Sequence, residues 1–196
     1  MTVKILGVAG SMRDGSYSTR GIRLCLDIAG ARGAETRLLD LRTAELPMYQ
    51  PDEVKTSDSV REVAEAVHWA DAFLLGTPDY HGSMSGAMKN FLDYHWAEFA
   101  GKLFGYVCAS HEKGLTVMDH LRTAVRQCYG WSLPYGVSLH GEQDFDAAGA
   151  VVNQRLSLRL NMLTRDMLIY GELLRRQFDR DLNDRERDTF AARYAR

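Results

Sequence analysis

The sequence predicts an α/β fold, a three-layer sandwich in which helices cover both faces of an open parallel sheet. Three observations predict it. Short runs rich in β-branched residues alternate with amphipathic helical patterns along the chain. Most of the strand-like runs are largely apolar and do not alternate with polar residues, which is typical of strands buried on both faces of a parallel sheet. At 196 residues, 45% of them hydrophobic, the chain can bury a core without disulfide or metal cross-links.

Five runs are predicted to form the strands. They are Val3–Ala9, Glu35–Leu41, Asp71–Thr77, Leu103–Ala109 and Leu133–Leu139. Because each crossover is long enough for a helix, the strands are expected to be parallel. Five strands favour the order 2-1-3-4-5 over the six-stranded dinucleotide-binding order. Ligands of such sheets bind at the carboxyl ends of the strands, so the loops after strands 1, 3 and 4 are expected to carry the function.

Helical patterns fill the intervals between these runs. The first helix is expected to follow Ser16 or Ser18 and to end at Gly30 or Gly33, and Asp58 or Ser59 is expected to cap the second. The second to fifth helices are predicted over 58–69, 85–97, 114–129 and 151–178. Residues 42–57 are expected to form a long loop. The last pattern is the most regular, with apolar residues three or four positions apart. They are Leu156, Leu160, Leu163, Met167, Tyr170 and Leu174.

Charge is distributed unevenly along the chain. The formal net charge is −2, yet residues 151–196 contain ten arginines, no lysine and seven acidic residues. On a helix most of these arginines fall outside the apolar stripe and form a solvated face. After Asp179 the charges alternate in sign, which favours contacts between helices or subunits over nucleic-acid binding. We therefore expect one domain over 1–178 and a C-terminal helical extension over 179–196.

The cysteines and the apolar runs indicate the compartment. Cys25, Cys108 and Cys128 are widely spaced and have neither metal-site nor redox-motif spacing. The apolar run at the N-terminus is shorter than that of a signal peptide, and no run is long enough to span a membrane. We expect reduced, mostly buried thiols in a cytoplasmic protein that does not contact membranes.

The loop after the first strand is rich in hydrogen-bond donors. Residues 10–20 contain two glycines, the cation Arg13 and four hydroxyl side chains, those of Ser11, Ser16, Ser18 and Thr19. The loop lies before a helix N-terminus, where free N–H groups and the helix dipole favour an anion. Neither the dinucleotide fingerprint nor the P-loop pattern is present. The loop therefore favours a mononucleotide phosphate held by hydroxyls; the alternative is a solvent-facing loop with an ordinary serine cap.

The loop after the third strand can accommodate a planar ring. In residues 77–90, Gly82 and Gly86 permit close approach of the backbone, and Tyr80 and His81 offer flat surfaces. Ser83 or Ser85 is expected to cap the next helix. The alternative is an ordinary turn with its tyrosine packed on the domain. Asp79 and His81 have no third ligand at a convincing spacing, so no metal site is predicted.

Together these loops resemble those of the NADPH-dependent FMN reductase family of the flavodoxin-like superfamily. The family pattern Gly-Ser-x-Arg-x-x-Ser-x-Asn corresponds here to residues 10–18, GSMRDGSYS. The family pattern Pro-Glu-Tyr-Asn-x-Ser corresponds to residues 78–83, PDYHGS, followed by Gly86, Lys89, Asn90 and Asp93. The resemblance extends over about residues 3–175 in the order of elements. It implies a flavodoxin-like fold with residues 1–178 as the FMN-binding domain.

The resemblance also implies the site residues. The FMN phosphate would be held by Ser11, Arg13, Ser16 and Ser18. The ribityl chain and isoalloxazine ring would be lined by Pro78, Asp79, Tyr80, His81 and Gly82, and the pyrimidine edge by Ser110 and Gly114. The chain departs from the family at Ser18, Asp79 and His81, where the family has Asn, Glu and Asn. It also departs in the loop 110–114, which is usually small and glycine-rich and here is polar.

The implied reaction is hydride transfer from NADPH or NADH through FMN to a small acceptor, which would be a flavin, a quinone, an azo compound or a metal ion. Such transfer needs two rings in contact and little else, so no catalytic side chain is predicted. The acceptor would be faced by His81, His111 or Lys113. The extra phosphate of NADPH would be met by Lys113 or a nearby arginine. The alternatives are a flavodoxin-like electron carrier, which is usually more acidic than this chain, and a flavin-free regulatory or binding protein.

An aromatic cluster follows the third predicted helix. It consists of Tyr94, His95, Trp96 and Phe99. The cluster would either pack in the core or form a subunit interface. The family resemblance favours the interface, because these reductases usually pair near the flavin, and it implies a homodimer or homotetramer.

Overall fold

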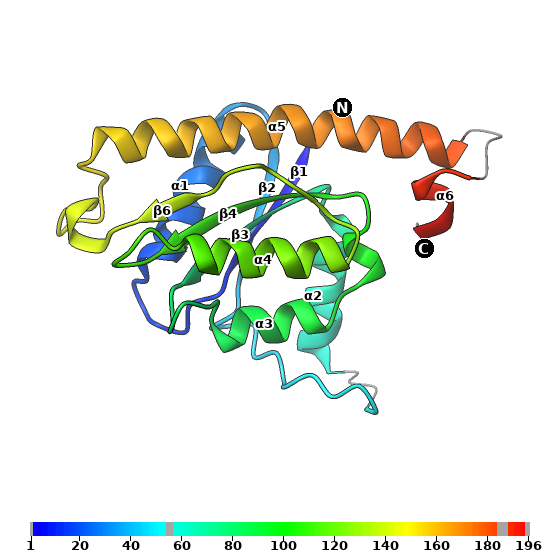
Figure 1. The fold of residues 1–196 in the computed structure, drawn as a ribbon, viewed down its shortest axis with the longest axis horizontal. Coiled ribbons are helices and arrows are strands. Elements are labelled where there is room, and N and C mark those ends of the chain that lie inside the picture. The colour runs from blue at the N-terminus through cyan, green and yellow to red at the C-terminus, as the bar shows by residue number, and fades with distance from the viewer. Residues whose placement is uncertain (1, 54–56, 184–187, 195–196) are drawn as a thin grey trace.

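The structure of the chain is a computed structural model that describes residues 2–53, 57–183 and 188–194 (Figure 1). The elements, in order, are β1 Lys4–Ala9, α1 Tyr17–Ala31, β2 Glu35–Asp40, α2 Asp58–Trp69, β3 Ala72–Pro78, α3 Gly86–Asp93, η1 Ala97–Phe99, β4 Leu103–Ala109, α4 Leu115–Gln127, β5 Trp131–Ser132, β6 Val137–Leu139, η2 Gly141–Gln143, α5 Gln154–Asn183 and α6 Phe190–Tyr194. The alternation of strands and helices is the predicted one.

The strands form one parallel sheet. Its order is β2-β1-β3-β4-β5, and β6 also pairs with β4, which confirms the predicted order. The register pairs Ala9 of β1 with Asp40 of β2 and with Gly76 of β3. It pairs Pro78 of β3 with Ala109 of β4. The carboxyl ends of β1, β3 and β4 therefore lie at the same edge of the sheet.

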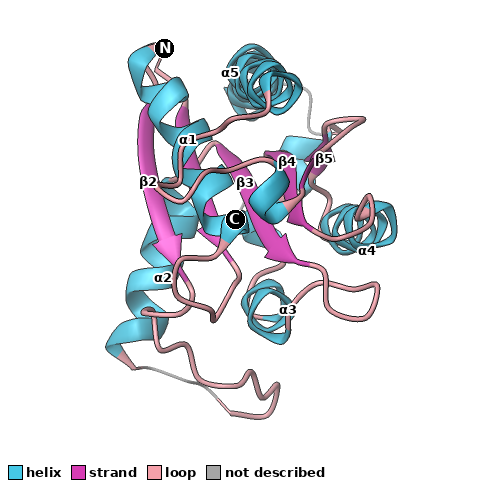
Figure 2. Ribbon diagram, turned by 90° about the vertical axis from the view of Figure 1, so that its left-hand side faces the viewer, coloured by secondary structure: helices cyan, strands magenta, loops and turns pink. Residues whose placement is uncertain are grey.

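Helices cover both faces of the sheet, as Figure 2 shows. On one face α1 and α5 pack over Ile5, Leu74 and Val107. On the other face α2, α3 and α4 pack over Leu6, Phe73 and other side chains that point the opposite way from the same strands. Each central strand therefore contributes to two cores, which explains why its sequence is apolar without alternation. The predicted three-layer α/β sandwich is confirmed.

The fifth strand was predicted as one run over 133–139, and the structure corrects this. Two short strands, β5 and β6, pair with the start and the end of β4 and are interrupted over 133–136. Pro134 has no N–H group to donate to a neighbouring strand. A side chain at Gly136 would meet the sulfur of Met118 at 2.7 Å. These local constraints divide into two strands the single strand that the hydrophobic pattern predicts.

The last helix is longer than predicted, and one of its inward positions differs. α5 runs from Gln154 to Asn183, past the expected end at 178. Tyr170, predicted in the apolar stripe, is exposed, and Gly171 is buried instead. A Cβ at Gly171 would lie 3.2 Å from a methyl group of Val3. The close approach of helix and sheet at this turn therefore selects the glycine.

The other predicted helices are confirmed with shifted ends. α3 ends at Asp93, before the predicted 97, and its N-cap is Ser85, whose hydroxyl oxygen accepts from the N–H of Met88 at 3.1 Å. α4 is one residue shorter at its start and two at its end than predicted. α2 has the predicted bounds, but its N-cap is Ser57 and not Asp58 or Ser59. Residues 54–56 of the predicted loop lie outside the described residues.

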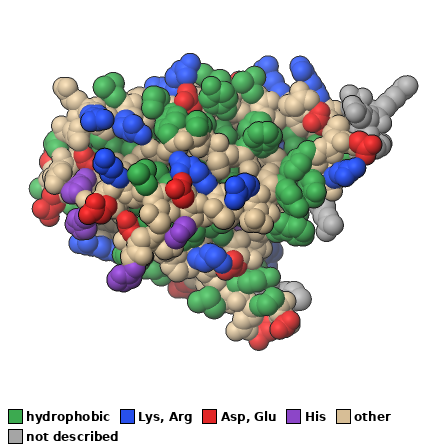
Figure 3. All heavy atoms as spheres, viewed as in Figure 1, with side chains coloured by type: hydrophobic (Ala, Val, Ile, Leu, Met, Phe, Trp, Pro, Cys, Tyr) green, Lys and Arg blue, Asp and Glu red, His purple; other side chains and the backbone are tan. Residues whose placement is uncertain are grey.

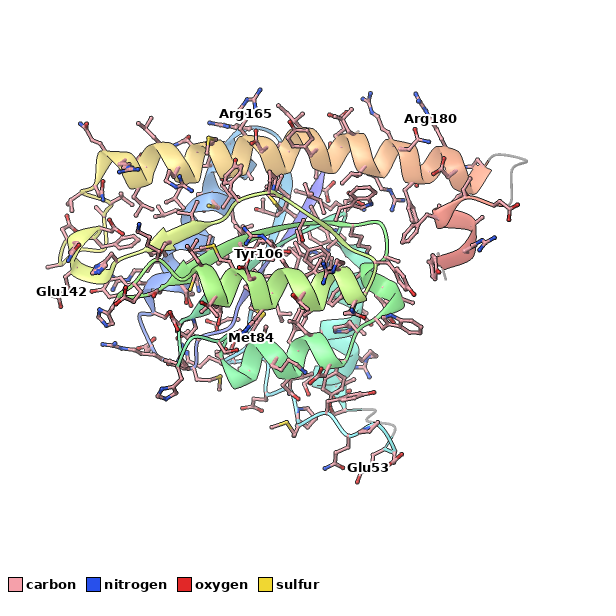
Figure 4. The ribbon with its side chains drawn as sticks, viewed as in Figure 1. Glu53, Met84, Tyr106, Glu142, Arg165 and Arg180 are labelled. Atoms are coloured by element: carbon pink, nitrogen blue, oxygen red, sulfur yellow. The ribbon has the colours of Figure 1, made fainter. Side chains whose placement is uncertain are left out.

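The C-terminal extension packs back on the body of the molecule. The ring of Tyr194 stacks on Tyr129 with centroids 4.2 Å apart, and Ala191 is buried. Arg165 and Arg180 point away from α5 into solvent (Figure 4). Residues 184–187 and 195–196 of this extension lie outside the described residues. No described helix has the length and apolarity needed to cross a membrane.

Candidate functional site

The loops after β1, β3 and β4 meet at one end of the molecule. Gly10, the first residue after β1, donates its N–H to the carbonyl of Gly76 at 2.7 Å, and Ser110, the first after β4, donates to Leu139 at 3.0 Å. Histidine side chains gather at this end in Figure 3, and Figure 4 labels Glu142 there. The exposed side chains at these loops include those of His81, His111 and Lys113. The sequence-predicted site residues therefore come from loops on one edge of the sheet.

The loop after β1 presents donors without acceptors. Ser16 and Ser18 are buried, and their hydroxyl oxygens lie 2.9 Å apart. One bond between two hydroxyls uses one proton, so the other proton has no acceptor among the described residues. Ser16 is the N-cap of α1 but makes no side-chain cap bond, which leaves the N–H groups of the first turn without partners in the part of the chain that the structure describes. This donor set fits a phosphate.

Arg13 supplies the charge of this loop. Its N–H donates to the Ser11 hydroxyl oxygen at 3.2 Å, and its side chain is exposed. No carboxylate of the described residues pairs with its guanidinium. The neighbouring Asp14 pairs instead with Arg42 at 3.4 Å. Arg13 is therefore available to an anion in the loop.

The loop after β3 forms a tight turn over residues 80–83. Tyr80 and Ser83 exchange two backbone hydrogen bonds of 3.0 and 3.1 Å. The two central residues have positive φ, 57° at His81 and 76° at Gly82, as a type I′ turn requires. Asn and His are among the side chains that tolerate this region best. The replacement of the family's Asn by His81 is therefore compatible with the backbone.

Most backbone donors of this loop are already used. Asp79 donates to the carbonyl of Ala109 at 2.8 Å, Tyr80 to Ser83, and Gly82 to Asp79 Oδ1 at 2.9 Å. Proline has no N–H. Within residues 78–82, the N–H of His81 alone has no partner among the described residues. A planar ligand beside this turn would meet that donor.

The loop after β4 is held from several sides. Gly114 has φ 60°, and a Cβ there would lie 2.7 Å from the sulfur of Cys108. His140 Nε2 lies 2.9 Å from the carbonyl of His111, which makes Nε2 the protonated nitrogen because a carbonyl only accepts. The N-cap of α4 is Gly114, which has no side chain to accept from the N–H groups of the first turn. The uncapped N-terminus of α4 therefore also faces this edge.

The cysteine nearest to the site is not reactive. Cys108 is fully buried, and burial together with the Asp79 carboxylate raises the pKa of its thiol to about 12. Burial likewise raises the pKa of Cys25 to about 11. Both thiols stay protonated near neutral pH, so the site offers no thiolate nucleophile. The described residues contain no group of three or more His, Cys, Asp or Glu side chains that could hold a metal ion.

The aromatic cluster after α3 divides between core and surface. Phe99 is fully buried and His95 is 6% exposed, and their rings lie 5.5 Å apart. Trp96 is exposed. Burial lowers the pKa of His95 to about 4, and charges on His68 and Lys102 act the same way while Glu98 opposes them. His95 Nε2 has no hydrogen-bond partner in the described part of the chain.

Several residues at this edge were not predicted from the sequence. His120 Nδ1 lies 3.0 Å from the Ser83 hydroxyl, and Asp144 Oδ2 accepts from the N–H of His140 at 2.5 Å. The ring of Tyr17 stacks on Phe145 at 5.5 Å. These contacts join segments far apart in sequence. No local pattern marks them, although the cluster of polar residues after β6 was a visible signal.

Comparison with known proteins identifies relatives. A family model described as NADPH-dependent FMN reductase matches residues 3–144. An NAD(P)H-dependent FMN reductase of Pseudomonas aeruginosa is 28% identical over 78% of this chain and 86% of its own length. An FMN-dependent NADPH-azoreductase of Staphylococcus aureus is 31% identical over 73% of this chain and 79% of its own. An NADPH azoreductase of a Bacillus strain is 33% identical over 55% of this chain and 62% of its own.

The fold also has solved counterparts. FerB of Paracoccus denitrificans, described as a flavoenzyme NAD(P)H:(acceptor) oxidoreductase, superposes with a TM-score of 0.74 at 19% identity. The superposition covers 88% of this chain and 98% of that one. A WrbA-like flavodoxin of Agrobacterium tumefaciens superposes with a TM-score of 0.58 at 16% identity, over 90% and 99% of the two chains. At such identities the likeness concerns the fold alone.

Proposed function

The chain belongs to the NADPH-dependent FMN reductase family, and from this premise we propose that it is an FMN-dependent NAD(P)H oxidoreductase. It takes hydride from NADPH or NADH and passes it through FMN to a small acceptor. The observation that carries the proposal is the loop after β1, where Ser16 and Ser18 bury a hydroxyl proton without an acceptor below the uncapped start of α1. A phosphate supplies the missing acceptor.

Four residues would hold the phosphate group. The hydroxyls of Ser11, Ser16 and Ser18 would act as neutral donors, and Arg13 would donate from its charged guanidinium. A guanidinium carries the charge opposite to that of the phosphate and can donate two parallel hydrogen bonds to it, so Arg13 is expected to contribute most. Ser18 offers one donor where the family's Asn offers two. The N–H groups at the start of α1, which receive no side-chain cap bond, support this assignment, because the N-terminus of a helix favours an anion.

The flavin ring would lie beside the turn 80–83. Pro78, Asp79, Tyr80, His81 and Gly82 would line it, with the free N–H of His81 as the donor in this loop. No described atom lies within 4 Å of a Cβ built at Gly82, so the backbone there is open to close approach. Ser110 and Gly114 would lie at the pyrimidine edge, near the uncapped N-terminus of α4. A helix N-terminus favours negative charge at that edge.

The protein's part in the reaction is positional. Bound FMN supplies the hydride-accepting chemistry. The loops after β1, β3 and β4 would fix the ring and leave one face open to the nicotinamide and then to the acceptor. No side chain need transfer a proton, and the buried thiol of Cys108 takes no part. His81, His111 and Lys113 are exposed at this edge and would meet the acceptor or the NADPH phosphates.

The acceptor and the assembly belong to the same proposal. The acceptor would be a flavin, a quinone, an azo compound or a metal ion, and the azoreductase relatives favour testing azo dyes first. We propose a homodimer or homotetramer, with residues 1–178 as the FMN-binding domain and 179–196 as its extension. All three cysteines are free and two are buried, which supports the cytoplasm as the location.

Two measurements test the proposal. The purified protein is expected to bind FMN, detected by quenching of flavin fluorescence, and to oxidise NADPH or NADH when FMN and an azo dye, quinone or ferric acceptor are present. FMN binding without NAD(P)H oxidation would indicate the electron carrier instead. Absence of FMN binding would indicate the flavin-free alternative and would overturn the proposal.

A further inference from the structure

The carboxylate of Asp79 is used within the protein. Asp79 follows β3 directly and its side chain is half-buried. Oδ1 accepts from the N–H of Gly82 at 2.9 Å, and Oδ2 accepts from the hydroxyl of Ser110 at 2.8 Å. Each carboxylate oxygen therefore has a donor inside the protein. A role for this carboxylate as a ligand of the flavin would compete with both contacts.

Ser110 carries the connection into the second loop. Its hydroxyl oxygen accepts from the N–H of Glu112 at 3.0 Å while the hydroxyl donates to Asp79. Its own N–H donates to the carbonyl of Leu139 at 3.0 Å, and the residue is 8% exposed. A continuous series of hydrogen bonds thus runs from Gly82 through Asp79 and Ser110 to Glu112.

This series joins the two loops that would flank the flavin ring. The turn 80–83 follows β3 and the loop 110–114 follows β4. The pairing of β3 with β4 ends at Pro78 and Ala109, and past it the described residues form one backbone hydrogen bond between these two segments, from the N–H of Asp79 to the carbonyl of Ala109. By taking the N–H of Gly82, Asp79 also leaves the N–H of His81 as the available donor of the turn. The carboxylate therefore influences both the spacing of the loops and the donor that they present.

We propose that Asp79 is a positioning residue that fixes the loop after β3 to the loop after β4 before the flavin binds. The inference rests on the proposed flavin site. Asp suits this role better than the family's Glu, because its short side chain can accept from a backbone N–H three residues ahead in the turn. A Glu carboxylate would lie one methylene further from the same N–H.

The experiment begins with the protein free of flavin. Amide hydrogen exchange is measured over residues 80–83 and 110–114 in the wild type and in Asp79→Ala, Asp79→Asn and Ser110→Ala. In Asp79→Ala both segments are expected to exchange about tenfold faster, because both lose a bond to the same carboxylate. In Asp79→Asn the side-chain carbonyl can still accept from the N–H of Gly82, and the side-chain NH₂ can donate to the hydroxyl oxygen of Ser110. The exchange rates of both segments are therefore expected to stay within about threefold of those of the wild type.

FMN affinity is the second readout. If the loops are preset by Asp79, Asp79→Ala lowers FMN affinity about tenfold, and Asp79→Asn restores most of it. Asp146→Ala is the matched control, since Asp146 Oδ1 accepts from the N–H of Ala150 at 2.8 Å within its own exposed loop and joins no second loop in the described part of the chain. Its exchange over 80–83 and 110–114 and its FMN affinity are expected to equal those of the wild type.

The outcomes separate this inference from the proposed function. Faster exchange in 80–83 alone in Asp79→Ala would show that the loops are independent and would overturn the inference. Equal loss of FMN affinity in Asp79→Asn and Asp79→Ala would also overturn it, because charge rather than geometry would then matter. A wild-type protein that binds no FMN would overturn the proposed function, while the exchange data would still report whether the loops are joined.

Discussion

The hydroxyl of Ser85 donates a hydrogen bond of 2.5 Å to the carbonyl oxygen of Gly10, which lies 75 positions earlier in the chain. The same hydroxyl oxygen accepts from the N–H of Met88 as the N-cap of α3. One buried side chain therefore fixes the start of α3 to the loop that follows β1. The phosphate loop and the loop after β3 are held in a constant relation by this contact.

Replacing Ser85 by alanine is expected to destabilise the fold by about 2 kcal/mol, because the change removes a helix cap and leaves a buried carbonyl without its donor. Urea unfolding of the flavin-free protein measures this difference. Ser57→Ala is the control, since Ser57 caps α2 in an exposed position and its cap bond is 3.4 Å. We expect a loss below about 1 kcal/mol there. Equal losses in the two variants would contradict the structural role of the contact between Ser85 and Gly10.

A pair of glycines tests the backbone of the site. Gly114→Ala places a side chain at φ 60° and 2.7 Å from Cys108 Sγ, so we expect a loss of about 1–3 kcal/mol in stability. Gly86→Ala is the matched change in the first turn of α3, where no described atom lies within 4 Å of the added Cβ. It is expected to be neutral or to stabilise by up to about 1 kcal/mol. Thermal unfolding of both variants checks the difference, and a stable Gly114→Ala protein would contradict the described loop.

His95 makes stability depend on acid pH. Its pKa is about 4 in the folded chain against 6.5 for an ordinary histidine, so the unfolded chain binds the proton first as pH falls. Above pH 6.5 the protonation of His95 does not reduce the free energy of unfolding. As the pH falls below 6.5, the free energy of unfolding declines by about 1.4 kcal/mol per pH unit until the pKa of the folded chain is reached. Below that pH the contribution of this group is constant.

The change His95→Phe is expected to remove this dependence, because the ring packs against Phe91 and Phe99 and its Nε2 has no partner among the described residues. Urea unfolding at pH 7.5 and pH 5 measures it, and the wild type is expected to lose about 2 kcal/mol more than the variant. His111→Gln, at an exposed histidine that is not among the groups acting on the pKa of His95, serves as the control and is expected to keep the slope of the wild type. Parallel pH profiles for the wild type and His95→Phe would refute the burial of a neutral imidazole.

Arg13 is expected to govern the affinity for FMN. Arg13→Ala removes an unpaired cation from the proposed phosphate loop and is expected to weaken FMN binding at least tenfold, without loss of stability. Fluorescence titration measures the affinity, and riboflavin, which has no phosphate, should bind the wild type and the variant alike. Arg23→Ala is the control, because Arg23 is exposed further along α1. Unchanged FMN affinity in Arg13→Ala would remove the phosphate assignment.

The sequence was sufficient to predict the order of the sheet, because buried parallel strands are apolar on both faces and each is followed by a periodic helix. It was not sufficient for the fifth strand. There Pro134 and the contact of Gly136 with Met118 divide a continuous apolar run, and only the second of these depends on residues far away in sequence. Tyr170 was misplaced for a similar reason, since its neighbour Gly171 is selected by Val3 on another element.

For the candidate site, the sequence predicted which loops come together but not how their side chains are used. The residue types of the loop 77–90 indicate a polar, flexible approach to a ligand. They do not show that Asp79 Oδ2, after β3, accepts from the hydroxyl of Ser110, after the neighbouring β4, or that His120 Nδ1 lies beside the hydroxyl of Ser83. Such contacts depend on the pairing of β3 with β4 and on the placement of α4, which no local pattern encodes.

The place of α5 has a consequence for the time course of synthesis. Val3 and Ile5 of β1 belong to the core that Leu156, Leu160 and Leu163 of α5 complete. The ribosome makes β1 and α1 long before α5, so the part of this face that α1 does not cover stays exposed while most of the chain emerges. The phosphate loop follows β1, so the strand that carries it completes its core on this face only when α5 has been made. A chain stopped after the loop 140–153 would expose the face and would depend on chaperones to avoid aggregation.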